Sequence, residues 1–255
     1  MAKQLMNKQL TSLQHPIVKH LVKLRQNCDY RYDHQAVIVE GVKPIKELVS
    51  KRPFKTLLVL DESLVPPGAK SKETYVVTEG ILHKISGMQT SEGILAEVEM
   101  PANASLKGCK RLIVLDGIND PGNLGTILRT ALALGWEGAF IIQDSCDPYN
   151  EKALRAARGA TFRLPIAQGS WEDLKRLITV NRLNPVVADL DGVAPDELKK
   201  KKEGIVLILG NEAHGPSAEA KSLGQAVTIP MPGPMESLNV SVAGALLMYA
   251  LTRKS

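Results

Sequence analysis

Six short runs of consecutive hydrophobic residues recur along the second half of the chain, at residues 111–117, 138–143, 161–166, 185–190, 204–210 and 226–230. Most of these runs are continuous rather than alternating, which is typical of strands that are covered on both faces of a parallel sheet. Between them, hydrophobic positions recur every three or four residues, as they do in helices. We predict these helices at residues 123–134, 150–159, 170–179 and 194–201. The alternation predicts an α/β domain built on a parallel sheet.

The first hundred residues carry a different pattern. A hydrophobic stripe at three- and four-residue spacing predicts a helix over residues 11–28. Short β-rich runs and two helical segments follow: strands at 36–41, 56–60, 74–78 and 93–100, and helices at 43–50 and 79–86. Residues 101–110, PANASLKGCK, mix Pro, Asn, Ser and Gly without periodicity and mark a boundary. We therefore predict two α/β domains, residues 1–103 and residues 104–255.

The composition is that of an ordinary globular protein, with 44% hydrophobic and 23% charged residues in a chain of 255. No apolar run reaches the length of about eighteen residues that a membrane span needs. The N-terminal MAKQLMNKQL lacks the apolar core of a signal peptide, so we expect a cytoplasmic protein. The three cysteines are widely spaced and the five histidines are scattered. We expect neither a disulfide framework nor a metal site.

Positive charge is concentrated at the N-terminal end. Residues 1–55 contain eleven Lys and Arg against four Asp and Glu, whereas the rest of the chain is slightly acidic. A basic end of this kind suits the neutralisation of nucleic-acid phosphates. A solvated helix face gives a similar count, so charge alone leaves both interpretations open.

The first turn of the second domain reads DGINDPGNLGTILRT and follows the strand at 111–117. In a doubly wound dinucleotide-binding domain this turn carries the GxGxxG phosphate loop. Gly117, Gly122 and Gly125 do not have that spacing, and Asn123 stands where a dinucleotide loop prefers glycine. A nicotinamide-dependent oxidoreductase therefore loses most of its support.

Uncharged polar residues gather after three of the predicted strands, in the segments NDPGNLGTILR, GNEAHGPS and MPGPMESLN. The carboxyl ends of parallel strands share one edge of a sheet, where ligands bind, so we expect these segments to converge. Each also has a purely structural interpretation. Asn123 and Ser237 could cap helices, and Gly210 could permit a tight turn. Arg129, inside an apolar helix without a nearby acid, is harder to explain in that way.

Three longer segments resemble the signature motifs of the SpoU/TrmH branch of the SPOUT RNA ribose 2'-O-methyltransferases, which use S-adenosylmethionine. They are NDPGNLGTILRTALALG, LILGNEAHGPS and IPMPGPMESLNVSVAGALLMYAL, in the order and with the spacing found in that family. The first hundred residues also resemble the L30e-like substrate-binding domain of the members that act on ribosomal RNA. The resemblance implies a C-terminal SPOUT domain with a deep trefoil knot, an exception to the rule that chains do not thread through loops.

The same resemblance implies a homodimer. The C-terminal segment is almost wholly apolar, whereas terminal helices are usually amphipathic and partly solvated. In the family this helix is buried partly in its own protomer and partly against a second copy. Double burial of that kind explains a helix that is apolar on all sides.

Site residues follow from the resemblance by matching motif positions. The catalytic set is Asn123, Arg129, Glu212, Ser237 and Asn239. Main-chain groups of the second and third motifs would bind the cofactor, and here they belong to Leu209, Gly210, Ile229, Met231 and Leu238. An arginine side chain stays protonated at neutral pH, so a neutral guanidine is scarce. We therefore expect Arg129 to fix the target phosphate and to stabilise the developing 2'-oxyanion rather than to accept the proton.

The other catalytic positions receive supporting roles under the same resemblance. Asn123 and Asn239 would orient the ribose and Arg129, Glu212 would hold the arginine fork or a water, and Ser237 would position the nucleotide. The L30e-like domain favours ribosomal RNA of the 23S type over transfer RNA. The alternatives are a tRNA 2'-O-methyltransferase, a noncatalytic RNA-binding or ribosome-assembly module of the same fold, and a methyltransferase that confers antibiotic resistance.

Overall fold

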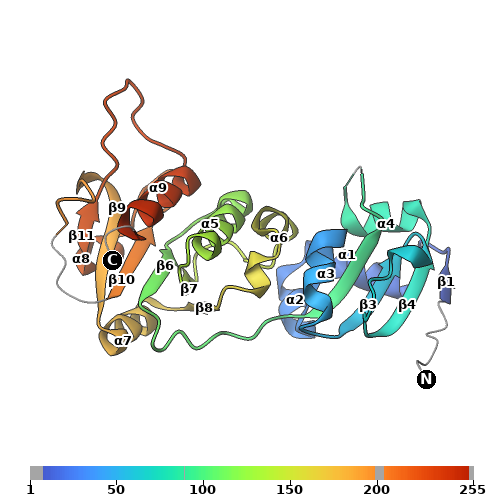
Figure 1. The fold of residues 1–255 in the computed structure, drawn as a ribbon. Coiled ribbons are helices and arrows are strands. Elements are labelled where there is room, and N and C mark those ends of the chain that lie inside the picture. Colours follow the sequence, from blue (N-terminus) through green and yellow to red (C-terminus); the bar gives the residue numbers. More distant parts are fainter. Residues whose placement is uncertain (1–7, 89, 199–203, 253–255) are drawn as a thin grey trace. The chain divides into compact units, whose positions relative to one another are not determined.

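A computed structural model describes residues 8–88, 90–198 and 204–252. The chain forms two compact units. The first comprises Met1–Pro101 and Tyr149–Glu151, and the second comprises Ala102–Pro148 and Lys152–Ser255. Each unit is built around its own sheet (Figure 1).

The first unit contains a five-stranded mixed sheet in the order β1-β4-β3-β5-β2. Its strands are β1 (Lys8–Leu10), β2 (Ala36–Glu40), β3 (Phe54–Val59), β4 (Ser71–Val77) and β5 (Ile94–Glu99). Its helices are α1 (Pro16–Gln26), α2 (Cys28–His34), α3 (Val42–Val49) and α4 (Glu79–Ser86). Strand β5 runs antiparallel to both β2 and β3, whereas β1, β4 and β3 are parallel to one another.

The second unit contains a six-stranded sheet in the order β11-β9-β10-β6-β7-β8, and neighbouring strands in it are parallel. The strands are β6 (Arg111–Leu115), β7 (Gly138–Ile142), β8 (Ile166–Gly169), β9 (Leu183–Val193), β10 (Gly204–Leu209) and β11 (Gln225–Val227). The helices are α5 (Pro121–Ala133), α6 (Glu151–Ala157), α7 (Trp171–Asn181), α8 (Ala218–Leu223) and α9 (Val240–Thr252). The expected parallel α/β architecture is confirmed.

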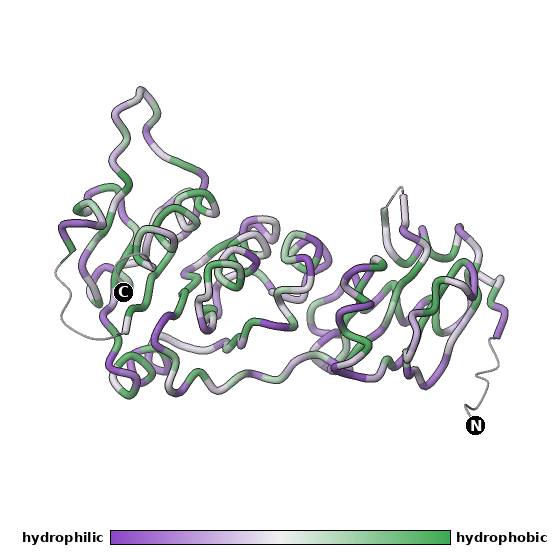
Figure 2. Tube along the Cα trace, viewed as in Figure 1, coloured by the Kyte–Doolittle hydropathy of each residue, from purple (hydrophilic) through white to green (hydrophobic). Residues whose placement is uncertain are grey.

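Alternate residues of these strands face two separate cores, because successive side chains of a strand point to opposite faces. Ile113 and Leu207 pack with residues of α5 and α9, whereas Leu112 and Val206 pack with residues of α7 and α8. The sheet is therefore covered on both faces, which is why its strands read as continuous apolar runs. Figure 2 shows hydrophobic residues along these strands and along α9.

One glycine allows two helices to approach closely. A Cβ atom at Gly125 in α5 would lie 2.2 Å from the carbonyl oxygen of Ala153 in α6, so any side chain there would force the two helices apart. Gly125 in the first motif therefore serves helix packing rather than phosphate binding.

Several predicted elements differ from the structure. The helix expected over 11–28 spans Pro16–Gln26, and a second helix, α2, follows because the side chain of Asn27 accepts a hydrogen bond from the Tyr30 backbone and caps it. The strand expected at 161–166 is wrong, since a 3-10 helix occupies Ala160–Phe162 and β8 begins only at Ile166.

The fourth predicted helix of the second domain is also absent from the part that can be described. A turn occupies residues 195–197 of the segment predicted as a helix over 194–201. Residues 194 and 198 have no regular structure, and the rest of that prediction, Lys199–Lys201, lies outside the described residues.

Candidate functional site

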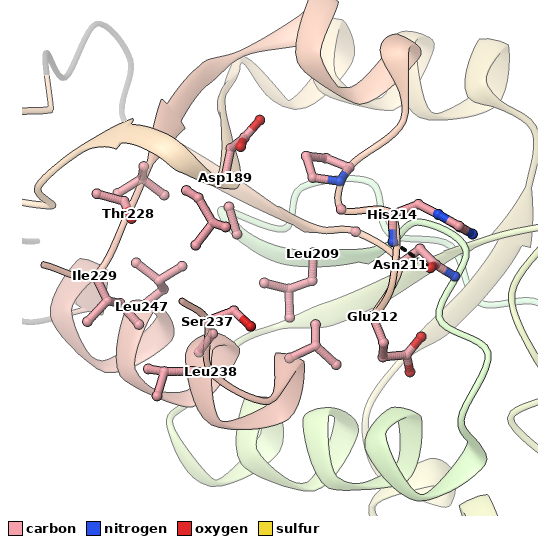
Figure 3. A pocket seen from close by; sticks show the side chains of 18 of the residues that line it. Asp189, Leu209, Asn211, Glu212, His214, Thr228, Ile229, Ser237, Leu238 and Leu247 are labelled. Carbon is pink, nitrogen blue, oxygen red and sulfur yellow. Dashed lines mark hydrogen bonds between the residues drawn. The ribbon is translucent and has the colours of Figure 1, made fainter. Parts of the chain in front are cut away.

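The three polar loops predicted from the sequence follow β6, β10 and β11, and they meet beside one cavity of about 350 Å³ (Figure 3). The cavity lies where β10 and β11 end, beside the middle of β9 and against the first half of α9. Its walls are mostly apolar and include Leu209, Ile229, Leu238, Val240 and Leu247. Asp189, Thr228, Asn211, Glu212 and Ser237 supply polar groups. An apolar pocket with a few polar side chains, and of this volume, is typical of a small-molecule site.

The first loop is shaped by an N-cap at Asp120. Its side chain accepts a hydrogen bond from the backbone nitrogen of Asn123 at 2.8 Å, and Pro121 occupies the first helical position. By residue type, Asn123 could itself have been the N-cap of this helix. Because Asp120 caps α5, the carboxamide of Asn123 is left to make contacts with other loops.

Glu212 joins the second loop to the first. Its carboxylate accepts hydrogen bonds from the backbone nitrogens of Asn119 and Asp120, both at 3.1 Å, and from the side chain of Asn123 at 3.0 Å. Burial acts to raise the pKa of Glu212, but these hydrogen bonds outweigh it and hold the pKa below its ordinary value. The carboxylate is therefore charged at neutral pH.

Asn239 connects the third loop to the same group. Its Oδ1 accepts a hydrogen bond from the backbone nitrogen of Ser241 at 2.9 Å and so caps α9, while its Nδ2 donates to Oδ1 of Asn123 at 3.0 Å. An ionised carboxylate only accepts, which directs the NH₂ group of Asn123 toward Glu212 and its oxygen toward Asn239. The three side chains form one hydrogen-bonded chain across three loops, which we call the Asn239–Asn123–Glu212 chain.

A second set of contacts fixes the loop after β10. The side chain of Asn211 donates to the carbonyl oxygen of Gly117 at 2.7 Å and accepts from the backbone of Ala213 at 2.9 Å. The buried carboxylate of Asp116 accepts from the backbone of Ser217 at 2.8 Å. A Cβ atom at Gly210 would lie 2.3 Å from the nitrogen of Pro216, so this tight turn requires glycine.

All five residues expected to bind the cofactor line the cavity, namely Leu209, Gly210, Ile229, Met231 and Leu238. Glu212 and Ser237 of the expected catalytic set line it as well, whereas Asn123 and Asn239 are joined to it through Glu212. Arg129 is exposed on α5, does not line the cavity, and makes no hydrogen bond or ion pair within the described part of the chain.

Sequence reasoning missed four polar residues of this region. Asn211 and Asp116 organise the loops, and the Asp189 carboxylate, which lines the cavity, accepts from Nζ of Lys221 at 2.8 Å. Asn211, Asp116 and Asp189 each stand at or just after the end of an apolar run, which is the signal that could have found them.

Cys146 lies close to the acidic side of the site. Burial, together with Glu212, Asp147 and Asp120, raises the pKa of its thiol to about 12. The thiol is protonated at neutral pH and cannot act as a nucleophile there.

The lowered pKa of Glu212 predicts a pH-dependent contribution to stability. A carboxylate whose pKa is depressed in the folded state stabilises the fold above its unfolded pKa, near 4.5, and loses that contribution as the pH falls through the folded value. We expect Glu212→Gln to lower the free energy of unfolding by about 1 kcal/mol at neutral pH. The NH₂ group of the glutamine would face a backbone N–H group that now donates to a carboxylate oxygen, and two donors cannot form a hydrogen bond. Urea unfolding of both proteins across the acid range should show the difference shrinking as Glu212 is protonated. A difference that does not depend on pH would contradict this account.

The described residues lack two kinds of feature. Within the described ranges, no group of three or more His, Cys, Asp and Glu side chains is placed to hold a metal ion. No helix among the described residues has the length and apolar character required to cross a membrane.

Comparison with known proteins gives two family matches. Residues 110–249 match the SpoU rRNA Methylase family, and residues 15–96 match the MRM3-like substrate binding domain. The first match includes all three loops of the site, and the second lies within the first compact unit.

Similar proteins extend over nearly the whole chain. The 23S rRNA (guanosine(2553)-2'-O)-methyltransferase RlmP of Bacillus subtilis is 30% identical, over 96% of this chain and 99% of its own. The crystal structure of an AdoMet-bound rRNA methyltransferase from Sinorhizobium meliloti is 28% identical with a TM-score of 0.84, covering 97% of this chain and 98% of its own. The SpoU methyltransferase AviRb from Streptomyces viridochromogenes is 26% identical with a TM-score of 0.82, covering 94% and 97% of the two chains. The chain belongs to the SpoU rRNA methylase family.

Proposed function

We propose that this protein transfers a methyl group from S-adenosylmethionine to a ribose 2'-hydroxyl in ribosomal RNA of the 23S type. The observation that carries the proposal is the position of the cavity directly beside the Asn239–Asn123–Glu212 chain. The similar protein of Bacillus subtilis, matched over nearly its full length, is named as a 23S rRNA 2'-O-methyltransferase, which favours rRNA over tRNA. An rRNA substrate also implies a cytoplasmic enzyme.

The cavity fits S-adenosylmethionine in size and chemistry. Its apolar walls suit a purine, and its polar groups suit a ribose and an amino acid moiety. We assign cofactor binding to main-chain groups of Leu209, Gly210, Ile229, Met231 and Leu238. When bound, the cofactor supplies a methyl group that is already electrophilic on its sulfonium. What the protein must add is alignment of the 2'-hydroxyl, whose proton passes to water as the new bond forms.

The residues beside the cavity are assigned to the RNA side of the reaction. Asn123 and Asn239 orient the target ribose, and Ser237 positions the nucleotide. Glu212 is held by three donors and has a lowered pKa, so it is a weak proton acceptor at neutral pH. The role of Glu212 is therefore to orient Asn123 and to hold either a water molecule or the guanidinium group of Arg129. Arg129 binds the target phosphate and stabilises the developing 2'-oxyanion.

The two units divide the work in this proposal. Residues 1–103 bind the RNA substrate and residues 104–255 carry out methyl transfer. The match of residues 15–96 to a substrate binding domain supports the first assignment. We also propose that the C-terminal segment is threaded into a deep trefoil knot. The return of α9 from β11 at the edge of the sheet to pack against α5 supports the threading.

We propose that the active protein is a homodimer through α9. One stripe of α9 is buried in its own core at Gly244, Met248 and Leu251. The opposite stripe consists of Val242, Leu246 and Tyr249, which are 47%, 47% and 50% exposed. Spacing of four and three residues places them on one face. Exposed apolar patches of this kind mark association surfaces.

A charge placed in that stripe should separate the two copies. We expect Leu246→Glu to shift the protein from dimer to monomer, because a buried unpaired carboxylate costs several kcal/mol. Light scattering after size exclusion measures the mass directly. Val180→Glu, at an exposed valine of α7, is the matched control and should leave the mass unchanged. A monomeric wild-type protein would refute the dimer.

The proposed activity is tested by mapping ribose 2'-O-methylation in total RNA from cells with and without the gene. We expect one rRNA position to lose its methyl group and to regain it when purified protein and S-adenosylmethionine are added to that RNA. Loss of a tRNA position would establish the tRNA alternative. Binding of RNA without any change in methylation, and without binding of S-adenosylmethionine by calorimetry, would establish the noncatalytic alternative.

A further inference from the structure

The first unit carries a cluster of three rings next to lysines on one surface. Helix α1 presents Lys19, His20 and Lys23 on its solvent side, and α2 presents Tyr30 and His34. Helical spacing places each group on one face of its helix. We call these five residues the α1–α2 patch. Lys19 and Lys23 belong to the basic N-terminal end noted in the sequence, whereas none of the three rings was selected there.

Tyr30 and His34 lie close to a stacked arrangement, and His20 packs against both at a steeper angle. The centroids of Tyr30 and His34 are 3.8 Å apart with an angle of 30° between the rings, and His20 lies 5.3 Å from His34. Nζ of Lys23 lies 4.3 Å from the centroid of Tyr30, within the range of a cation–π contact. His34 itself is exposed, so its imidazole is accessible to a ligand.

The orientation of these rings is fixed from below by a buried acid. Glu97 of β5 is almost fully buried and accepts from Oγ1 of Thr56 at 2.7 Å. Its other oxygen lies 3.1 Å from Nε2 of His20, and Nδ1 of His20 lies 3.0 Å from the hydroxyl of Tyr30. Burial acts to raise the pKa of Glu97, but the hydrogen bonds from His20 and Thr56 hold it below its ordinary value. A charged carboxylate therefore anchors His20 and, through it, Tyr30.

The electrostatics of the patch favour an anion beside the rings. Helix α1 contains no acidic residue and contributes two exposed lysines. The carbonyl end of α2 would repel an anion, but Nζ of Lys55 donates to the carbonyl oxygens of His34 and Gln35 at 3.0 and 3.2 Å. Asp29 and Asp33 are exposed acids of α2, and each precedes a ring of the patch by one residue, which places it about 100° around the helix from that ring. An anion is therefore favoured on the α1 side.

Accessible rings beside lysines match the chemistry of unpaired RNA. Single-stranded nucleic acid is bound by stacking of bases on rings and by cations that contact the phosphates. A preorganised ring loses little conformational freedom when a base stacks on it. Folded proteins also bind acidic peptides through lysines, but that use leaves the stacked, anchored rings unexplained.

We propose that the α1–α2 patch holds an unpaired nucleotide of the substrate RNA, with the base stacked on His34 and the adjoining phosphates at Lys19 and Lys23. The inference rests on the proposed function for the identity of the RNA, and it assigns RNA contacts to one surface of the first unit. Tyr30, His20 and Glu97 act as positioning residues that hold His34 and Lys23 in place.

Binding of the full-length protein to in vitro transcribed 23S rRNA tests the patch, measured by filter binding over a range of salt concentrations. We expect His34→Ala to weaken binding about tenfold, since one stacked base is worth about 1–3 kcal/mol. His34→Phe should restore most of the affinity, because a phenyl ring also stacks. Lys23→Ala should weaken binding and reduce the salt slope by about 0.7–0.9, the value of one lost phosphate contact.

The matched control is Lys46→Ala. Lys46 is an exposed lysine of α3. The buried residues of α3 do not belong to the hydrophobic cluster that packs under α1 and α4, so α3 is not part of the patch. We expect the affinity of Lys46→Ala for the RNA to stay within twofold of wild type. Thermal unfolding of each variant, followed by circular dichroism, should match the wild type because the substituted side chains are not in the core. Equal losses in Lys46→Ala and Lys23→Ala, or failure of His34→Phe to restore binding, would overturn the proposal.

Methyl transfer to the same RNA separates this inference from the proposed function. We expect the patch variants to raise KM for the RNA while leaving KM for S-adenosylmethionine unchanged. A wild type that binds the RNA but does not methylate it refutes the proposed function, and the binding series still decides the patch. A wild type that methylates the RNA with an unchanged KM in His34→Ala and Lys23→Ala refutes the patch alone.

Discussion

Replacement of Arg129 by lysine should lower the turnover number at least about 100-fold while leaving the affinity for S-adenosylmethionine within twofold of wild type. Lysine keeps the positive charge but lacks the planar fork that binds a phosphate or an oxyanion through two parallel hydrogen bonds. Loss of one donor to a developing oxyanion costs about 10²–10³ in rate. The cofactor should bind normally because Arg129 does not line the cavity.

Single-turnover methylation of rRNA and calorimetric titration with S-adenosylmethionine measure the two quantities separately. Arg176→Lys is the matched control, since Arg176 is an exposed arginine of α7 that pairs with Asp173 and lies away from the cavity. It should retain wild-type turnover. Full turnover by Arg129→Lys would rule out the catalytic role of this arginine, and a parallel loss of cofactor affinity would move that role to cofactor binding.

A phenylalanine at Ala243 should abolish measurable binding of S-adenosylmethionine, with a loss of at least about 100-fold in affinity. The proposed cofactor contacts are main-chain groups, which side-chain substitution cannot remove, so the informative change is to fill the space. Ala243 is on α9 and lines the cavity of about 350 Å³. A phenyl ring there would occupy volume that the cofactor needs, and the resulting steric overlap is costly, as it is when a side chain is enlarged in a packed core.

Ala243→Ser is the control, because it adds a single hydroxyl at the same position. We expect it to bind S-adenosylmethionine with nearly wild-type affinity in the same calorimetric titration. Both variants should bind rRNA as the wild type does, since the substitutions are inside the cavity. Unchanged cofactor affinity in Ala243→Phe would place the cofactor elsewhere.

Most strands of the parallel sheet could be predicted because burial on both faces leaves an uninterrupted apolar run in the sequence. The wrong strand at 161–166 shows the limit of that signal. Leu164 and Ile166 are buried, but the backbone nitrogen of Leu164 bonds back to Ala160 in a tight turn. An apolar run predicts burial, and the choice between strand and turn depends on hydrogen bonds that hydrophobicity does not record.

The site was predictable at the level of loops rather than of individual contacts. Strand order brings the three loops to one edge, and that follows from the α/β pattern. Which side chain caps which helix does not follow, because Asp120 and Asn123 are equally good N-caps by residue type. Asn239 both caps α9 and bonds to Asn123, a double role that only the fold determines. The roles assigned to Arg129 and Ser237 remain predictions from family resemblance.

The double role of Asn239 links the completion of folding to the assembly of the site. Residues 123 and 212 belong to loops that the chain produces before its last helix, yet their orientation is completed by the residue that starts that helix. A newly made or partly denatured chain in which the final segment has not yet docked therefore lacks the complete Asn239–Asn123–Glu212 chain. Under the proposed function, methylation is then confined to molecules in which α9 has docked.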